Sequence, residues 1–200
     1  MRVVLATGNP GKLQELSAML EPLAIEVVSL SQFTRTAVAE TGLTFVENAL
    51  IKARHAAQLA QLPAIADDSG LEVDALHGAP GIYSARYAGE HASDEDNLRK
   101  LLAALAGRPV AERAARYCCA LVYMRWEHDP FPLVSQASWE GRIAAAPRGS
   151  GGFGYDPIFE LPQRDVTVAE LPAAEKNQLS HRGQALRGLV LQLKKEVARD

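Results

Sequence analysis

The chain has 200 residues, 48% of them hydrophobic, and a formal net charge of −3 at pH 7. This length suits one globular domain with a substantial core, and the charge gives no broad basic field, which argues against extended nucleic-acid binding. The longest apolar stretches are far shorter than the roughly 20 residues of a membrane span, and no signal-peptide pattern opens the chain. We therefore expect a cytoplasmic protein that binds no membrane.

The first third of the chain alternates between strand and helix patterns. An apolar run at residues 3–6 predicts a strand, and leucines at helical spacing predict a helix over residues 12–23. A second strand is expected at residues 25–28. The sequence TFVE at residues 44–47 is a capping box and predicts a helix to about residue 61, followed by a short buried strand at residues 63–66.

The remainder begins with a long irregular stretch, residues 69–92, whose length suggests a functional loop. A helix should open at residues 93–96 and stop at Gly107, and strand formers at residues 116–126 and 133–139 predict an antiparallel pair. Ser180 can cap a last helix that runs to about residue 198. The sequence thus predicts a single α/β domain over residues 1–200, with a mixed central sheet and flanking helices.

Residues 7–12 (TGNPGK) lie between the first strand and the first helix and indicate a phosphate site. Two glycines allow close backbone approach, Lys12 adds positive charge, and a helix N-terminus attracts anions. The spacing is not that of a Walker A loop. A tight turn with Lys12 simply solvated is the alternative.

Two neighbouring carboxylates, Asp67 and Asp68, follow the short strand and are the best catalytic candidates. Adjacent strand residues face opposite ways, so one should be chemical and the other structural. The alternative is that both cap a turn at Ser69 and Gly70. The only two cysteines, Cys118 and Cys119, are adjacent in a strand pattern, and we expect neither a disulfide between them nor a metal site.

Further acidic and polar residues surround the start of the second helix. Glu40 has no evident structural role, whereas Glu47 is either a metal contributor or the capping partner of Thr44. Asn48 and Lys52 share a helical face that points either at phosphates or at solvent.

Near the C-terminal end, residues 149–154 (GSGGFG) match the letters of the dinucleotide fingerprint, but a turn and strand pattern follows in place of the required helix. We reject that interpretation. The loop instead either lets a base stack on Phe153 or Tyr155 or is a flexible hairpin with Phe153 in the core. Lys176 and residues 180–183 (SHRG) place cationic groups near a helix start, which favours an anionic or electron-rich ligand.

Together these motifs resemble the Ham1/RdgB family of inosine and xanthosine triphosphate pyrophosphatases. The resemblance covers nearly the whole chain, through residues 7–12, 44–49 (TFVENA), 66–70 (ADDSG), 78–87 (GAPGIYSARY), 152–157 (GFGYDP) and 180–183. It implies an elongated α/β fold with two lobes and a substrate cleft, a homodimer, Mg²⁺ dependence, and hydrolysis of ITP, dITP and XTP to a nucleoside monophosphate and pyrophosphate.

The resemblance also assigns roles to individual residues. Asp68 would be the general base, and Glu40 and Asp68 would bind Mg²⁺, with Glu47 a further contributor. The substrate-binding residues would be Thr7, Gly8, Asn9, Pro10, Gly11, Lys12, Ser69 and Lys176 for the phosphates and sugar, and Phe153, Gly154, Tyr155, Asp156, His181 and Arg182 for the base. A Maf-like nucleotide pyrophosphatase and a non-enzymatic nucleotide-binding regulator are the competing hypotheses.

Overall fold

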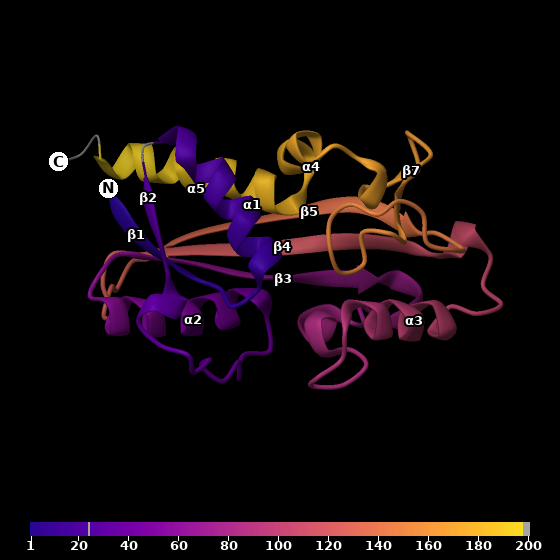
Figure 1. Cartoon of the computed structure of the whole chain (residues 1–200), viewed down its shortest axis with the longest axis horizontal. Helices are drawn as coiled ribbons and strands as arrows, with labels where there is room; N and C mark the ends of the chain where they lie inside the picture. Colours follow the sequence, from indigo (N-terminus) through magenta and orange to yellow (C-terminus); the bar gives the residue numbers. More distant parts are fainter. Residues whose placement is uncertain (24, 198–200) are drawn as a thin grey trace. The chain divides into compact units, whose positions relative to one another are not determined.

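A computed structural model describes residues 1–23 and 25–197 of the chain (Figure 1). The helices are α1 (Pro10–Leu20), α2 (Phe45–Ala60), α3 (Asp94–Ala104), α4 (Ala173–Leu179) and α5 (His181–Val197). The strands are β1 (Arg2–Ala6), β2 (Glu26–Ser29), β3 (Ala64–Val73), β4 (Ala114–Met124), β5 (Leu133–Ile143), β6 (Phe159–Leu161) and β7 (Val166–Thr167).

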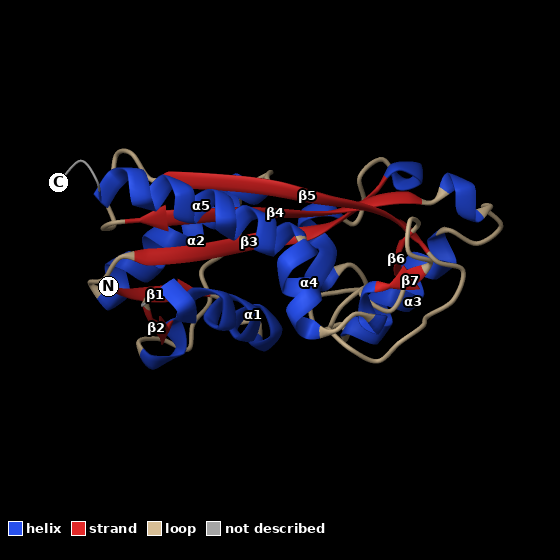
Figure 2. Ribbon diagram, turned by 90° about the horizontal axis from the view of Figure 1, so that it is seen from above, coloured by secondary structure: helices blue, strands red, loops and turns tan. Residues whose placement is uncertain are grey.

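The strands form one mixed sheet in the order β2-β1-β3-β4-β5-β6-β7 (Figure 2). Strand β1 pairs in parallel with β2 and β3, whereas β6 is antiparallel to both β5 and β7. The predicted α/β class, with a mixed sheet and flanking helices, is confirmed. The chain divides into two compact units, one made of Met1–Asp68, Cys119–Ala137 and Arg182–Asp200 and the other of Ser69–Cys118 and Ser138–His181.

The first unit has helices on both sides of its strands, with α1 and α5 on one side and α2 on the other (Figure 1). Alternation along β1 explains the layers, because successive side chains of a strand point to opposite faces. Val3 and Leu5 pack with leucines of α1 and α5, whereas Val4 and Ala6 pack with the alanines of α2. The small alanine side chains let α2 lie close to the strands.

The second unit has its own hydrophobic core. Leu98 and Leu101 of α3, with Leu105 directly after it, pack with residues from β3, β4 and β6, including Tyr117 and Phe159. Helix α3 begins with the capping box of Ser93 and Asp96, as the acidic opening of this segment predicts. Gly107 follows the helix with a positive φ of 77°, a conformation that favours glycine.

Most predicted elements are present, and the main differences are as follows. Helix α1 ends at Leu20 rather than residue 23, and the next three residues, which include Pro22, form a 3₁₀ turn. Strand β3 continues to Val73, so residues 69–73 are not irregular. Helix α4 was not predicted, because its seven residues carry too short a pattern to detect. Within the described ranges, no helix is long and apolar enough to cross a membrane.

Candidate functional site

Asp67 and Asp68 both lie inside β3, which continues five residues beyond them to Val73. The alternative in which they cap a turn is therefore wrong. So is the expectation that the strand ends at these carboxylates. Because neighbouring strand residues face opposite sides of a sheet, the two carboxylates meet different partners. The expectation that the two side chains face opposite ways is confirmed, and the assignment of one to chemistry and the other to structure stays a prediction.

The Asp67 carboxylate is fully paired and completely buried. Its Oδ1 lies 2.6 Å from Lys12 Nζ, and its Oδ2 accepts hydrogen bonds from Arg182 Nε at 2.9 Å and Cys119 Sγ at 3.3 Å. Arg182 also pairs with Glu15 of α1. Burial opposes ionisation of Asp67, but the charges of Arg182 and Lys12 outweigh it and hold its pKa well below the ordinary value.

These contacts show how residues 7–12 are positioned. Asn9 is the N-cap of α1, its Oδ1 accepting from Lys12 N at 3.1 Å, and Pro10 occupies the first helical turn. The helix begins two residues earlier than predicted, and Asn9 already satisfies one of the N–H groups assigned to a ligand. Lys12 is not simply solvated, since its side chain is only 15% exposed and pairs with Asp67.

On the other face of β3, Asp68 pairs with Lys52 of the same unit, and Lys52 also contacts Glu40. Lys52 Nζ of α2 lies 2.6 Å from Asp68 Oδ1 and 3.2 Å from Glu40 Oε1. Asp68 Oδ2 is buried and has no hydrogen-bond partner among the residues that the structure describes. Burial therefore raises the pKa of Asp68, and the opposing charge of Lys52 does not cancel the effect.

Lys52 responds in the complementary way. Burial alone would lower its pKa, but the negative charges of Asp68 and Glu40 outweigh burial and raise it. The Lys52 ammonium is therefore firmly charged at neutral pH. Of the two alternatives for this helical face, solvent exposure is wrong, because the Lys52 side chain is 14% exposed.

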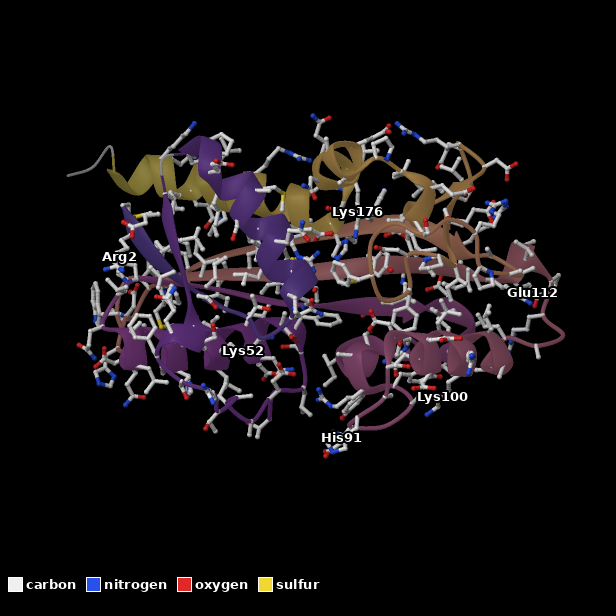
Figure 3. The ribbon with its side chains drawn as sticks, viewed as in Figure 1. Arg2, Lys52, His91, Lys100, Glu112 and Lys176 are labelled. Carbon is white, nitrogen blue, oxygen red and sulfur yellow. The ribbon has the colours of Figure 1, made fainter. Side chains whose placement is uncertain are left out.

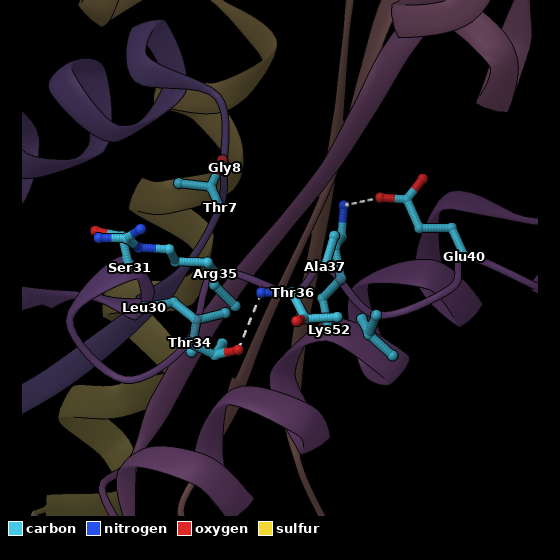
Figure 4. A pocket seen from close by; sticks show the side chains of 12 residues that line it. Thr7, Gly8, Leu30, Ser31, Thr34, Arg35, Thr36, Ala37, Glu40 and Lys52 are labelled. Atoms are coloured by element: carbon cyan, nitrogen blue, oxygen red, sulfur yellow. Dashed lines mark hydrogen bonds and ion pairs between the residues drawn. The ribbon is translucent and has the colours of Figure 1, made fainter. Parts of the chain in front are cut away.

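A pocket of about 380 Å³ adjoins this charged group (Figure 4). Lys52 and Glu40 line it together with Thr7 and Gly8 of the predicted phosphate loop. Arg35, hydroxyl side chains from residues 31–36 and a few apolar residues form the rest of the wall. The structure therefore places Glu40, Lys52 and the start of the predicted phosphate loop, which the sequence suggested separately, around one cavity.

The segment that carries Glu40 is held by the first turn of α2. Asn48 Oδ1 accepts from Gly42 N at 2.9 Å, and a Cβ at Gly42 would meet Glu47 Cβ at 2.6 Å. Glu47 accepts hydrogen bonds from Leu43 N and from Thr44 Oγ1, at 2.8 and 3.0 Å, while Thr44 caps the helix. These contacts support the structural alternative for Glu47.

The predicted base-binding residues of the second unit cluster around Asp156, which is buried. Its Oδ1 accepts from Tyr117 Oη at 3.1 Å, and its Oδ2 accepts from Phe153 N at 2.9 Å and Lys176 Nζ at 2.6 Å. Burial raises the pKa of Asp156 despite the charge of Lys176. Gly152 has a positive φ of 72°, and any Cβ there would collide with Asp156 Oδ2, so only glycine fits.

Aromatic rings complete this cluster. Tyr117 stacks on His181 with ring centroids 4.8 Å apart, and Lys176 Nζ lies 4.5 Å from the centroid of the Phe153 ring. Lys176, labelled in Figure 3, is itself buried on α4. Tyr155 lies in the hydrophobic core, where its Oη donates to Ser84 O at 2.8 Å, so Phe153 is the better placed of the two rings for stacking.

The remaining predicted residues are placed simply. Gly154 N donates to Asp94 Oδ2 at 2.7 Å, and Ser69 is half-buried on β3. No helix follows residues 149–154, which confirms the rejection of the dinucleotide fingerprint. Sequence reasoning missed Tyr117, because its contact with Asp156 spans 39 positions. It also left Lys52 undecided, although the helical spacing from Asn48 pointed to it.

The fold and these residues define an α/β protein with a pocket that is lined by Thr7, Gly8, Glu40 and Lys52, and Lys52 also contacts Asp68. The chain belongs to the Ham1 family, which it matches over residues 3–192. It is 60% identical over 197 residues to a dITP/XTP pyrophosphatase of Vibrio parahaemolyticus, covering 98% of each chain, and 59% identical to one of Vibrio cholerae, covering 94% of each.

Solved structures agree with this assignment. A Ham1 protein from Coxiella burnetii matches with a TM-score of 0.88 and 48% identity, covering 98% of this chain and 99% of that one. A nucleoside-triphosphatase named dITP/XTP pyrophosphatase from Mycobacterium abscessus matches with a TM-score of 0.75 and 44% identity, covering 94% and 98%. The predicted family resemblance is thus confirmed over nearly the full length.

Proposed function

We propose that this protein hydrolyses deaminated purine nucleoside triphosphates, namely ITP, dITP and XTP, to the nucleoside monophosphate and pyrophosphate. Relatives at about 60% identity carry the name dITP/XTP pyrophosphatase. The observation that carries the proposal is the environment of Asp68, which has one oxygen on Lys52 and the other buried without a partner among the described residues. A buried carboxylate with a raised pKa is suited to general-base work.

In this proposal Asp68 orients a water molecule and accepts its proton as the water attacks the α-phosphorus. The phosphates would contact Thr7, Gly8 and Lys52 in the pocket, and Asn9, Pro10, Gly11, Lys12, Ser69 and Lys176 would complete the phosphate and sugar contacts. Positioning and charge neutralisation do most of the work in phosphoryl chemistry. In this proposal Lys52, which lines the pocket, supplies positive charge to the phosphates.

Glu40 and Asp68 are the proposed Mg²⁺ ligands, and the residues present fit this ion. Both carboxylates reach the same ammonium of Lys52, and Asp68 Oδ2 offers a buried oxygen with no protein partner in the described ranges. No group of three or more metal-binding side chains occurs among residues 1–23 and 25–197. Mg²⁺ typically uses one or two carboxylates and fills its remaining positions with water and phosphate. When bound, the ion offsets negative charge on the polyphosphate.

We propose that the base is enclosed by residues 153–156 with His181 and Arg182. Hypoxanthine and xanthine carry a 6-oxo acceptor where adenine carries an amino group, so donors from His181 or Arg182 favour the deaminated bases. In the protein alone, Arg182 pairs with Asp67 and Glu15. Guanine shares the 6-oxo group, and its rejection needs a further contact at the 2-position.

A panel of nucleoside triphosphates with detection of released phosphates tests the proposal. We expect pyrophosphate from ITP, dITP and XTP, and little from ATP, GTP or pyrimidine nucleotides. Preference for pyrimidine or modified nucleotides would favour the Maf-like alternative, and tight binding without turnover would favour a regulator. Release of orthophosphate alone would contradict cleavage between the α- and β-phosphates.

Metal dependence is tested in the same assay. A chelator should abolish turnover, Mg²⁺ should restore it, and Ca²⁺ should support it poorly, because its longer and less regular coordination would misplace the phosphates. Full activity in chelator would rule out a metal role for Glu40 and Asp68. One catalytic domain over residues 1–200, a homodimer and a cytoplasmic location also remain our proposals, and light scattering tests the dimer.

A further inference from the structure

The Lys52 ammonium contacts both of the carboxylates that are proposed to bind the metal ion. Its Nζ lies 2.6 Å from Asp68 Oδ1 and 3.2 Å from Glu40 Oε1, and these are the two carboxylates proposed to hold Mg²⁺. The side chains of Lys52 and Asp68 are 14% and 9% exposed. Little water therefore screens the ammonium from a second cation at the same oxygens.

The charges at this position make the two cations rivals. A divalent ion on both carboxylates would lie within a few ångströms of a full positive charge, and like charges at that distance repel strongly in a partly buried site. Without the ammonium, however, the two carboxylates would repel each other. In the protein alone Lys52 therefore stabilises the same pair of groups that the metal needs.

The pocket provides an alternative partner for Lys52. Its side chain lines the cavity together with Thr7 and Gly8 of the phosphate loop, and Figure 4 shows the Lys52 ammonium directed at Glu40. Phosphate oxygens bound in that cavity would accept hydrogen bonds from the ammonium, and their negative charge is comparable to that of the carboxylates. Transfer of Lys52 to the phosphates would remove its positive charge from both carboxylates.

We propose that Lys52 competes with the divalent cation for Glu40 and Asp68, so that the nucleotide and the metal bind cooperatively. The inference rests on the proposed function for its metal and its ligand. It differs from a role of Lys52 in phosphate binding alone, which would leave the affinity of the free protein for metal unchanged. By linkage, a nucleotide that raises metal affinity is itself bound more tightly when the metal is present.

The decisive experiment is a Mn²⁺ titration of the protein without nucleotide, with free Mn²⁺ followed by electron paramagnetic resonance. Lys52→Met keeps the length of the side chain and removes its charge. We expect the variant to bind Mn²⁺ at least about tenfold more tightly than the unmodified protein, equivalent to about 1.4 kcal/mol. The control Lys194→Met removes the same charge from an exposed position on α5 and should bind Mn²⁺ as the unmodified protein does.

Equal or weaker Mn²⁺ binding by Lys52→Met, or no binding by either protein, would overturn the proposal. Lys52→Gln is titrated in parallel, and circular dichroism confirms the folded state of each variant, so that loss of one variant to misfolding leaves the other to decide. A second titration adds a dITP analogue with a methylene bridge between the α- and β-phosphorus atoms. The analogue should raise Mn²⁺ affinity at least about threefold more in the unmodified protein than in Lys52→Met, and an equal gain would contradict the coupling.

The two proposals fail in distinguishable ways. If no triphosphate releases pyrophosphate, the function is wrong, yet the titration without nucleotide still reports whether Lys52 and the metal compete. If turnover is as proposed but Lys52→Met binds Mn²⁺ no better, then the function stands and Lys52 is only a phosphate ligand.

Discussion

On one face of β3, the Asp67 carboxylate contacts Lys12, Arg182 and Cys119, whereas on the other face Asp68 keeps one oxygen buried without a partner among the described residues. The pKa values of the two aspartates therefore shift in opposite directions, that of Asp67 being lowered and that of Asp68 raised. Full pairing fixes a structural carboxylate, while incomplete pairing leaves one able to take up a proton. Four substitutions, with Lys12→Ala as a comparison, test this contrast.

The largest expected effect is on the stability of the folded state, at Asp67. Asp67→Asn removes the carboxylate that the largely buried Lys12 and Arg182 share, while Arg182 keeps its ion pair with Glu15. Breaking a buried ion pair by removing one partner typically costs about 3–5 kcal/mol. Urea unfolding should show a loss in this range. A loss below about 1 kcal/mol would mean that Asp67 is not the structural member of the pair.

At Asp68 the expected effect is on turnover. Asp68→Asn keeps the shape of the side chain but removes its basicity, so turnover of dITP should fall at least about 100-fold, the low end for a general base. The loss of stability should be smaller than in Asp67→Asn, because Lys52 keeps its contact with Glu40 and because burial already disfavours the ionised form of Asp68, whose pKa is raised. Steady-state kinetics and urea unfolding are measured on both variants. Equal losses of turnover in two equally stable variants would contradict the assignment of a structural role to Asp67 and a catalytic role to Asp68.

The layers of the fold were predictable because they depend on local spacing. The alternation along β1 and the leucines of α1 specify which face each residue buries. The opposite environments of Asp67 and Asp68 followed from the same period of two. The continuation of β3 beyond Asp68 could not be predicted in this way. Ser69 and Gly70 are residues typical of a turn, and only pairing within the sheet makes them part of a strand.

The partners of the site residues were harder to predict. Arg182 and Asp67 are 115 positions apart, and Lys52 and Asp68 are 16 apart on different elements, so no local pattern joins them. Sequence showed that charges gather near the motifs but not which carboxylate each cation meets. Those pairings depend on how α1, α2 and α5 pack on the strands, which is tertiary information.

A smaller effect is expected at Arg182, which belongs to the Asp67 face yet is proposed to read the base. Arg182→Lys keeps a positive charge between Asp67 and Glu15 but loses the planar guanidinium fork. The ratio of kcat/KM for dITP over dATP should fall about tenfold, or about 1.4 kcal/mol. Lys12→Ala should instead lower kcat/KM for all substrates by similar factors, because a phosphate contact does not depend on the base. If Arg182→Lys also lowers kcat/KM for dITP and dATP equally, then residues other than Arg182 recognise the base.

The smallest effect concerns Asp129, an ordinary structural carboxylate that serves as a reference for the other two. It accepts hydrogen bonds from Arg125 N and Nε, each at 2.9 Å, and from Phe131 N at 3.0 Å, and these hold its pKa at about 2. Because the folded pKa lies below the unfolded value of 3.8, this carboxylate stabilises the protein above pH 4. That contribution is lost as the pH falls through the folded pKa, and Asp129→Asn should lack it.

Urea unfolding of both proteins between pH 7 and pH 2 measures the difference. The Arg125 side chain is 39% exposed, so solvent screening limits the expected difference to on the order of 1 kcal/mol. The gap in unfolding free energy between the two proteins should be constant at higher pH and close below about pH 4. A gap that persists unchanged to pH 2 would show that the hydrogen bonds of Asp129 do not depend on its charge. Contacts to both carboxylate oxygens would then not explain why the pKa values of Asp67 and Asp129 are lowered while that of Asp68 is raised.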